Sequence, residues 1–136
     1  MRKITLIISI IIFQSLSFGQ EQQLHDGTGQ IRWASFEEVE KLSKVAKKPI
    51  LIFIHTDWCS WCKRMDHSTF KDPQVTSFIN TYFYPIKFNA ETQDTIRFLG
   101  QTYSNPSPQI KRSQNNLAKE IMGGSTQFPT LVFLNH

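Results

Sequence analysis

The chain has 136 residues, the length of one domain, and its 15 Lys and Arg residues outweigh 11 Asp and Glu residues to give a formal net charge of +4. Four lysines cluster on one expected helix, at positions 41, 44, 47 and 48. Such a cluster is typical of a solvated helix face rather than of a nucleic-acid-binding patch, so we expect no nucleic-acid partner. The sequence also contains no glycine-rich phosphate loop, internal repeat or low-complexity tract.

The first 19 residues have the layout of a secretory signal peptide. A basic start, Arg2 and Lys3, precedes an almost wholly apolar run at 4–13, and small residues follow up to an expected cleavage after Gly19. The apolar run is about half of the ~20 residues that a transmembrane helix requires. An uncleaved amino-terminal anchor is the alternative. We therefore expect an exported protein, located in the periplasm or outside the cell, whose net charge falls from +4 to +2 when the segment is removed.

The folded domain is expected to span residues 31–136, after a flexible lead-in at 20–30. Its first element is predicted to be a short strand at 31–33. Ser35 and Glu38 then fit a capping box that begins a helix. The apolar residues of this helix recur at helical spacing and are expected in the core: Phe36, Val39, Leu42 and Val45.

A buried strand then leads directly to a pair of cysteines. Residues 50–54 form a continuous apolar run rich in β-branched residues, which is typical of a strand buried on both faces. The expected elements that follow are a helix from Lys63, a helical turn or two after Asp72-Pro73, a strand at 82–88, a β-hairpin at 95–103 that turns at Gly100, a loop at 105–108, a helix at 114–122 and a strand at 130–134. Pro85 places a strand start or a sheet edge within 82–88. The alternation of strands and helices predicts an α/β fold.

The cysteines of the sequence, Cys59 and Cys62, form one C-x-x-C motif. A disulfide that closes a four-residue loop contributes only about 2 kcal/mol in the chain-entropy model, against roughly 3 kcal/mol for fifteen residues. Such a pair is a poor structural staple and is better suited to being made and broken. A purely structural disulfide, or a zinc site completed by His55 or His67, is the alternative.

The position of the motif indicates which cysteine reacts first. A thiolate is the attacking species, and the amino terminus of a helix stabilises it through unpaired N–H groups and the helix dipole. Cys59 lies where the strand gives way to the helix, and Cys62 is one turn deeper. We therefore expect Cys59 to attack a substrate disulfide and Cys62 to resolve the mixed disulfide.

Two sequence motifs carry a resemblance to a known family. Trp58-Cys59-Ser60-Trp61-Cys62-Lys63 follows the buried strand and continues as Arg64-Met65-Asp66, and Phe128-Pro129-Thr130 precedes a later strand. This pattern resembles the thioredoxin superfamily, and within it the bacterial exported thioredoxin-like proteins with a W-C-x-W-C-K-x-M-D signature. The resemblance implies a thioredoxin-like α/β fold, with a central mixed sheet flanked by helices.

The resemblance also implies roles for individual residues. Cys59 matches the family nucleophile and Cys62 the resolving cysteine. Trp58 matches the aromatic residue packed beside the pair, Pro129 matches the cis-proline that faces it, and the backbone of Phe128 matches the segment that pairs with an extended substrate. Trp61 lies between the cysteines and is expected to be exposed and to contact substrates. The catalytic candidates are thus Cys59 and Cys62, and the substrate-binding candidates are Trp58, Trp61, Phe128 and Pro129.

Three features depart from the family pattern. Ser60-Trp61 replaces the Gly-Pro of thioredoxin itself, and Phe53 stands where thioredoxin has a buried acid. The chain also stops at His136, directly after the expected strand at 130–134, where the family normally continues with another strand and a helix. The sequence is expected to be either truncated or a whole protein with one sheet edge and one sheet face uncovered. A non-functional truncated product is therefore a further hypothesis.

These observations predict a thiol–disulfide oxidoreductase that exchanges disulfides with exported proteins and needs no metal or organic cofactor. Its electrons would pass to or from a partner redox protein, which in this family is often membrane-bound. The family likeness favours a disulfide reductase. The alternatives are a disulfide oxidase or isomerase, and a peptide- or partner-binding module in which the disulfide is only structural.

Overall fold

The computed structural model of the chain describes residues 29–135. The predicted signal peptide at 1–19 and most of the predicted lead-in at 20–30 lie outside the described residues. Within 29–135, no helix has the length and hydrophobicity required to span a membrane.

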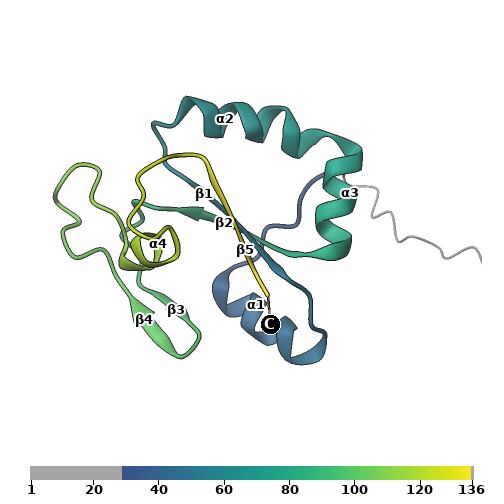
Figure 1. Cartoon of the computed structure of the whole chain (residues 1–136), viewed down its shortest axis with the longest axis horizontal. Coiled ribbons are helices and arrows are strands. Elements are labelled where there is room, and N and C mark those ends of the chain that lie inside the picture. The colour runs from purple at the N-terminus through teal and green to yellow at the C-terminus, as the bar shows by residue number, and fades with distance from the viewer. Residues whose placement is uncertain (1–28, 136) are drawn as a thin grey trace, which may run out of the picture.

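A three-stranded mixed sheet forms the centre of the described domain (Figure 1). Its middle strand is β1 (Ile50–His55), the apolar run identified in the sequence. β2 (Tyr84–Asn89) pairs with β1 in parallel, and β5 (Thr130–Leu134) pairs with it in antiparallel. The expected mixed sheet is therefore confirmed, and β1 is buried because strands flank it on both edges and other elements cover both of its faces.

Helices pack on both faces of this sheet (Figure 1). One face carries α2 (Ser60–His67), the short 3₁₀ helix η1 (Thr69–Lys71) and α3 (Pro73–Tyr82). The other face carries α1 (Phe36–Val45), α4 (Asn116–Ile121) and a separate hairpin of β3 (Ile96–Phe98) and β4 (Gln101–Tyr103). Alternate residues of β1 feed the two resulting cores, as the period of a strand requires.

Several local signals form the structures that they predict. Ser35 and Glu38 make the reciprocal hydrogen bonds of a capping box at the start of α1. The Asp72 side chain accepts the N–H groups of the first turn of α3, and Pro73 occupies the first helical position. Gly100 lies in the turn of the β3–β4 hairpin with a positive φ of 76°, a backbone conformation that glycine adopts without strain.

Two expectations were wrong. Residues 31–33 do not form a strand, and only Ala34 makes an isolated bridge to β2. The backbone N–H of Arg32 instead donates to Oδ1 of Asn80, a side chain on α3, at 3.0 Å, so it is not available to a strand ladder. Leu42 and Val45 are 45% and 90% exposed rather than buried. Helical spacing identifies the face on which a residue lies, but not how far the neighbouring elements extend along that face.

Three element boundaries also differ from the expectation. The helix after the cysteines begins at Ser60 rather than Lys63, because Cys59 itself caps it. The second strand begins at Tyr84 rather than at 82, because α3 continues through Tyr82. α4 begins at Asn116 rather than at 114, because the Asn115 side chain accepts a helical N–H and so marks the cap.

Candidate active site

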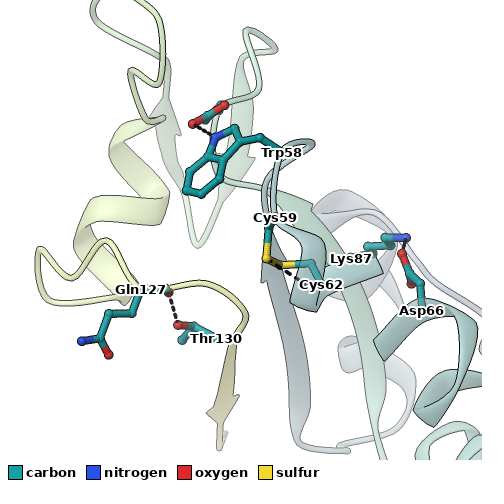
Figure 2. Close-up of a disulfide and its surroundings, with 8 residues drawn as sticks. Trp58, Cys59, Cys62, Asp66, Lys87, Gln127 and Thr130 are labelled. Atoms are coloured by element: carbon teal, nitrogen blue, oxygen red, sulfur yellow. Dashed lines mark hydrogen bonds and ion pairs between the residues drawn. A yellow bond between two sulfur atoms is a disulfide. The ribbon is translucent and has the colours of Figure 1, made fainter. Parts of the chain in front are cut away.

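The paired cysteines lie at the amino terminus of α2, directly after β1, and are joined by a disulfide with an S–S distance of 2.12 Å (Figure 2). Cys59 is the cap residue of the helix. Its Sγ accepts the backbone N–H of Cys62 at 3.1 Å, and its carbonyl accepts the N–H of Lys63 at 3.2 Å. The sulfur therefore lies at the positive end of the helix, where negative charge is stabilised.

Both cysteines are nearly inaccessible, with 4% of Cys59 and 2% of Cys62 exposed. They belong to a buried cluster that includes Phe53 and Phe70, whose ring centroids are 4.8 Å apart. The expected order of burial holds, but the difference between the two cysteines is small. An incoming substrate sulfur therefore has to reach Cys59 past the side chains that surround it.

Trp58 and Phe128 come together beside the disulfide although they are far apart in the sequence. Trp58 is 46% exposed, and its ring meets the ring of Phe128 edge to face at a centroid distance of 5.9 Å. Its Nε1–H donates to Oε1 of Glu91 at 2.7 Å (Figure 2). The indole is thus held at its edge and packed against the segment that the resemblance assigns to substrate binding.

The segment before β5 passes close to the disulfide (Figure 2). The peptide bond between Phe128 and Pro129 is cis, as the resemblance implies. The hydroxyl of Thr130 donates to the carbonyl of Gln127 at 2.7 Å, which closes the turn around this bond. The proline segment therefore lies on the same side of the domain as the amino terminus of α2.

Trp61 stands apart from this group. It is 65% exposed on α2, as predicted, and the Arg64 guanidinium lies 5.4 Å from the centroid of its ring. Trp58 has an edge hydrogen bond and a packed neighbour, whereas Trp61 presents most of its surface to solvent. Trp61 therefore offers a broad apolar contact beside the disulfide.

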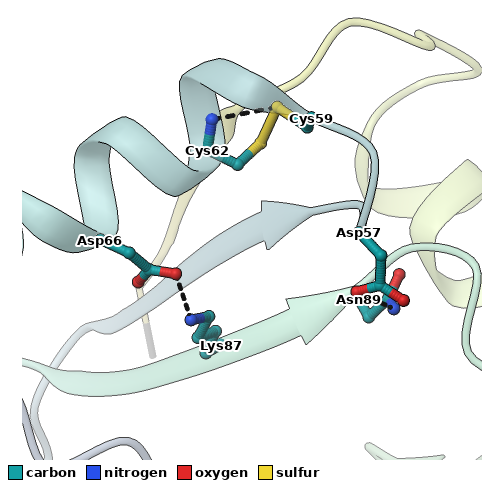
Figure 3. Close-up of polar contacts among 6 residues, drawn as sticks. All are labelled: Asp57, Cys59, Cys62, Asp66, Lys87 and Asn89. Carbon is teal, nitrogen blue, oxygen red and sulfur yellow. Dashed lines mark hydrogen bonds and ion pairs between the residues drawn. A yellow bond between two sulfur atoms is a disulfide. The ribbon is translucent and has the colours of Figure 1, made fainter.

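Beneath the cysteines, the position of the buried family acid is apolar. Phe53 is fully buried, and its ring stacks with that of His55 at 5.7 Å. Burial, and then the positive charge of Lys87, hold the pKa of His55 below its ordinary value. Asp57 accepts a hydrogen bond from Nδ2 of Asn89 at 3.2 Å at the exposed end of the strands (Figure 3).

Sequence reasoning missed a charged pair near the site. Asp66, one turn after Cys62 on α2, forms an ion pair with Lys87 on β2 (Figure 3). Lys87 lies opposite Phe53 in the parallel register of β1 and β2. Asp66 belongs to the quoted signature, but nothing in the sequence identifies its partner, because the pairing depends on where α2 crosses the sheet.

Two further neighbours of Trp58 were also missed. They are Glu91, which follows β2, and Arg112, whose guanidinium lies 4.6 Å from the centroid of the Trp58 ring. Both come from loops, and no local motif marks them.

Residues 29–135 contain no cluster of three His, Cys, Asp or Glu side chains placed to hold a metal ion, so the zinc alternative has no ligand set in the described part of the chain.

Residues 21–135 match the family model Thioredox_DsbH, described as a protein of unknown function, DUF255. The chain belongs to this family. Its similarity to the disulfide bond reductase DsbH of Chlamydia pneumoniae is 26% identity over 106 residues, which covers 77% of this chain and 57% of that protein. Its similarity to the thiol:disulfide interchange protein DsbD of Escherichia coli K12 is 32% identity over 74 residues, or 51% of this chain and 13% of that protein.

A solved structure described as DsbH oxidoreductase has the same fold. It matches with a TM-score of 0.52 and 22% identity, over 78% of this chain and 66% of that chain. The DsbH-family chain therefore has a thioredoxin-like fold and is a member of the thioredoxin superfamily. It spans a little more than half of the length of the Chlamydia pneumoniae relative and a small part of DsbD.

Proposed function

We propose that this DsbH-family protein is a thiol–disulfide oxidoreductase that acts on exported proteins, chiefly as a disulfide reductase. The observation that carries the proposal is the hydrogen bond from the Cys62 N–H to the Cys59 Sγ at the start of α2. In this bond the backbone N–H of Cys62 points at the attacking sulfur, and such a donor would stabilise a thiolate there. The names of the similar proteins, a disulfide bond reductase and a thiol:disulfide interchange protein, support the same class of reaction.

The reaction runs in two exchange steps. The Cys59 thiolate attacks one sulfur of a substrate disulfide, an S–S bond forms between enzyme and substrate, and the other substrate sulfur leaves as a thiolate that takes up a proton. The Cys62 thiolate then attacks the Cys59 sulfur, which releases the second substrate thiol and restores the Cys59–Cys62 disulfide. Two electrons pass to the substrate, and a dithiol partner protein returns them by the same exchange in the opposite sense.

The residues around the pair define where a substrate would lie. The backbone at Phe128, next to the cis Pro129, would pair with an extended substrate segment, and Trp58 and the exposed Trp61 would contact that segment. The predicted signal peptide at 1–19 supports a site of action outside the cytoplasm. The resemblance to exported thioredoxin-like proteins, whose redox partner is often membrane-bound, supports an electron donor in the membrane.

The surroundings of Cys59 favour reduction over oxidation. A strongly oxidising pair owes its potential to a strongly stabilised thiolate. Here the stabilising helix terminus is opposed by burial among apolar residues, since Cys59 is 4% exposed and shares a cluster with Phe53 and Phe70. This balance supports a pair toward the reducing end of the range.

The test is the reduction potential of the pair in the chain without residues 1–19, equilibrated against dithiothreitol or glutathione and read by thiol labelling and mass. A value near −270 mV, about that of thioredoxin, supports the reductase. A value near −120 mV, about that of a strong disulfide donor, overturns the direction and leaves the oxidase alternative. A folded protein whose pair does not equilibrate would contradict exchange chemistry altogether.

Two cysteine variants test the assigned roles. Cys62→Ser should accumulate a mixed disulfide with a substrate, whereas Cys59→Ser should accumulate none and should lose turnover. Mass spectrometry of the protein after incubation with a disulfide-bonded peptide measures both. If Cys59→Ser retains full peptide affinity and the unaltered protein shows no turnover, the binding-module alternative replaces the enzyme.

A further inference from the structure

An arginine lies on the ring of each tryptophan that precedes a cysteine of the pair. The Arg112 guanidinium is 4.6 Å from the centroid of Trp58, and the Arg64 guanidinium is 5.4 Å from the centroid of Trp61. Cation–π attraction of this kind holds a guanidinium in place while leaving its N–H groups at the edge of the ring plane. Both arginines are exposed, so these N–H groups face the solvent through which a substrate arrives.

Arg112 is brought to Trp58 by an ordered loop. The buried Asn105 fastens the loop across its base: its Nδ2 donates to the carbonyl of Ser113, and its Oδ1 accepts the hydroxyl of Ser113, both at 2.7 Å. Arg112 itself has a φ of +66°, in the left-handed region that non-glycine residues adopt at a cost of about 1 kcal/mol or more. The loop therefore holds Arg112 in an unfavourable backbone conformation that places its side chain over the indole.

Among the described residues, Arg112 forms no ion pair with the acidic residues around Trp58. The Glu91 carboxylate is bound to the Nε1–H at the edge of the same indole, and Asp57 is bound to Asn89. Within residues 29–135, the Arg112 guanidinium makes no ion pair or hydrogen bond, and its contact is the Trp58 ring. Lys63 adds a third exposed positive charge directly after Cys62. The rim of the disulfide thus carries more positive than negative charge.

We infer that Arg112, assisted by Arg64, makes the site prefer peptide substrates that carry a carboxylate side chain next to the reactive cysteine. A guanidinium binds a carboxylate with two parallel hydrogen bonds, which fixes its orientation as well as its position. Arg112 stacks on Trp58, the residue before Cys59, so a carboxylate bound there would lie on the Trp58 side of the site, and we expect the reactive substrate cysteine beside it. This inference rests on the exchange reaction proposed above.

The experiment uses the reduced chain without residues 1–19 and three disulfide-linked fluorogenic peptides. The peptides differ only in the residue next to the cysteine, which is Glu, Gln or Lys, and single-turnover rates are compared. We expect the Glu peptide to react about fivefold faster than the Gln peptide at low salt, equivalent to ~1 kcal/mol, and the Lys peptide to react most slowly. The ratio should fall toward one at about 0.5 M NaCl, because exposed charges are screened.

The variants separate charge from loop structure. Arg112→Gln should lower the Glu-to-Gln ratio to below about twofold. Arg112→Lys should retain only part of the ratio, because an ammonium cannot make the bidentate contact. Arg112→Gly also removes the side chain but relieves the left-handed backbone, so a loss of preference in this variant cannot be assigned to strain. Arg97→Gln is the matched control, since Arg97 is exposed on the β3–β4 hairpin and should keep the full ratio.

A neutral small disulfide, bis(2-hydroxyethyl) disulfide, measures exchange without the peptide contact. If the unaltered protein reduces it but shows no preference among the three peptides, or if Arg112→Gln keeps the full preference, the inference is overturned while the proposed function stands. If the unaltered protein does not reduce the small disulfide or any peptide, the proposed function is overturned, and the inference with it.

Discussion

The two faces of β1 differ in what they contain. Ile50, Ile52 and Ile54 point into one core, which α1, α4 and the β3–β4 hairpin complete with aliphatic and aromatic side chains. Leu51 and Phe53 point into the other, which α2, η1 and α3 complete and which holds both cysteines. Because successive residues of a strand face opposite sides, one six-residue strand supports a purely structural core and a core that contains the reactive sulfurs.

One face of β1 thus contributes mainly to stability, and the other also surrounds the cysteines. A change in the packing of the isoleucine face reaches the surroundings of the disulfide only indirectly, through Phe128, which packs against both cores. On the opposite face every change in packing is also a change in the environment of Cys59 and Cys62.

The largest effect is expected from truncating the strand on each face. Ile52→Ala should cost about 2–5 kcal/mol and Phe53→Ala about 3–5 kcal/mol of unfolding free energy, because both side chains are fully buried. Urea unfolding measures both. Only Phe53→Ala should shift the reduction potential of the pair, since Phe53 shares a cluster with the cysteines.

Should either variant fail to fold, Ile52→Val and Phe53→Leu provide milder versions of the same comparison. If substitutions at Ile52 and at Phe53 shift the reduction potential equally, the proposed difference between the two faces is wrong.

A smaller effect concerns pH and the histidine on the reactive face. Burial and Lys87 lower the pKa of His55, so the folded state holds this proton less tightly than the unfolded chain, whose histidine pKa is about 6.5. The contribution of neutral His55 to the free energy of unfolding is therefore fully present above about pH 6.5 and declines as the pH falls below it. When the pH is lowered from 7.5 to 5.0, the midpoint of urea unfolding should decrease less for His55→Gln than for the unaltered protein.

His67→Gln is the matched control, because His67 is exposed at the end of α2 and should leave the pH dependence unchanged. If His55→Gln has the same pH dependence as the unaltered protein, His55 is not the titrating group.

The smallest effect is expected from the ion pair that joins α2 to β2. Asp66 and Lys87 are 28% and 31% exposed, so their attraction is partly screened by solvent. A double-mutant cycle of Asp66→Asn and Lys87→Gln should give a coupling of about 0.2–1 kcal/mol that weakens at high salt. A coupling well above this range, insensitive to salt, would show that the pair behaves as a buried one and belongs to the core of the reactive face.

The sequence predicted those features whose interacting residues lie close together along the chain. The capping box of Ser35 and Glu38, the strand at 50–54 and the hairpin turn at Gly100 are encoded within a few residues, and all form as expected. The supposed strand at 31–33 failed because its backbone partner is an asparagine 48 positions away.

The candidate site shows the same limit. Cys59, Cys62 and Pro129 could be named from two short motifs, and the cis bond at Pro129 is present in the fold. The neighbours that fix Trp58 could not be named, since Glu91 is 33 positions away and Arg112 comes from a loop without a motif. The side chains proposed to perform the exchange are thus encoded locally, whereas those that surround them are brought together by the fold.

One consequence follows from Cys59 serving as the cap of α2. The sulfur proposed to exchange with a substrate also caps the start of the helix, so opening the disulfide would replace a neutral cap with a charged one, which the amino terminus of a helix favours. The rate at which the Cys62 backbone amide exchanges its hydrogen with solvent should therefore differ between the oxidised and the reduced protein. Conversely, binding that disorders the first turn of α2 would remove this stabilisation of the Cys59 thiolate. The reactivity of Cys59 therefore depends on whether this one helical turn is formed.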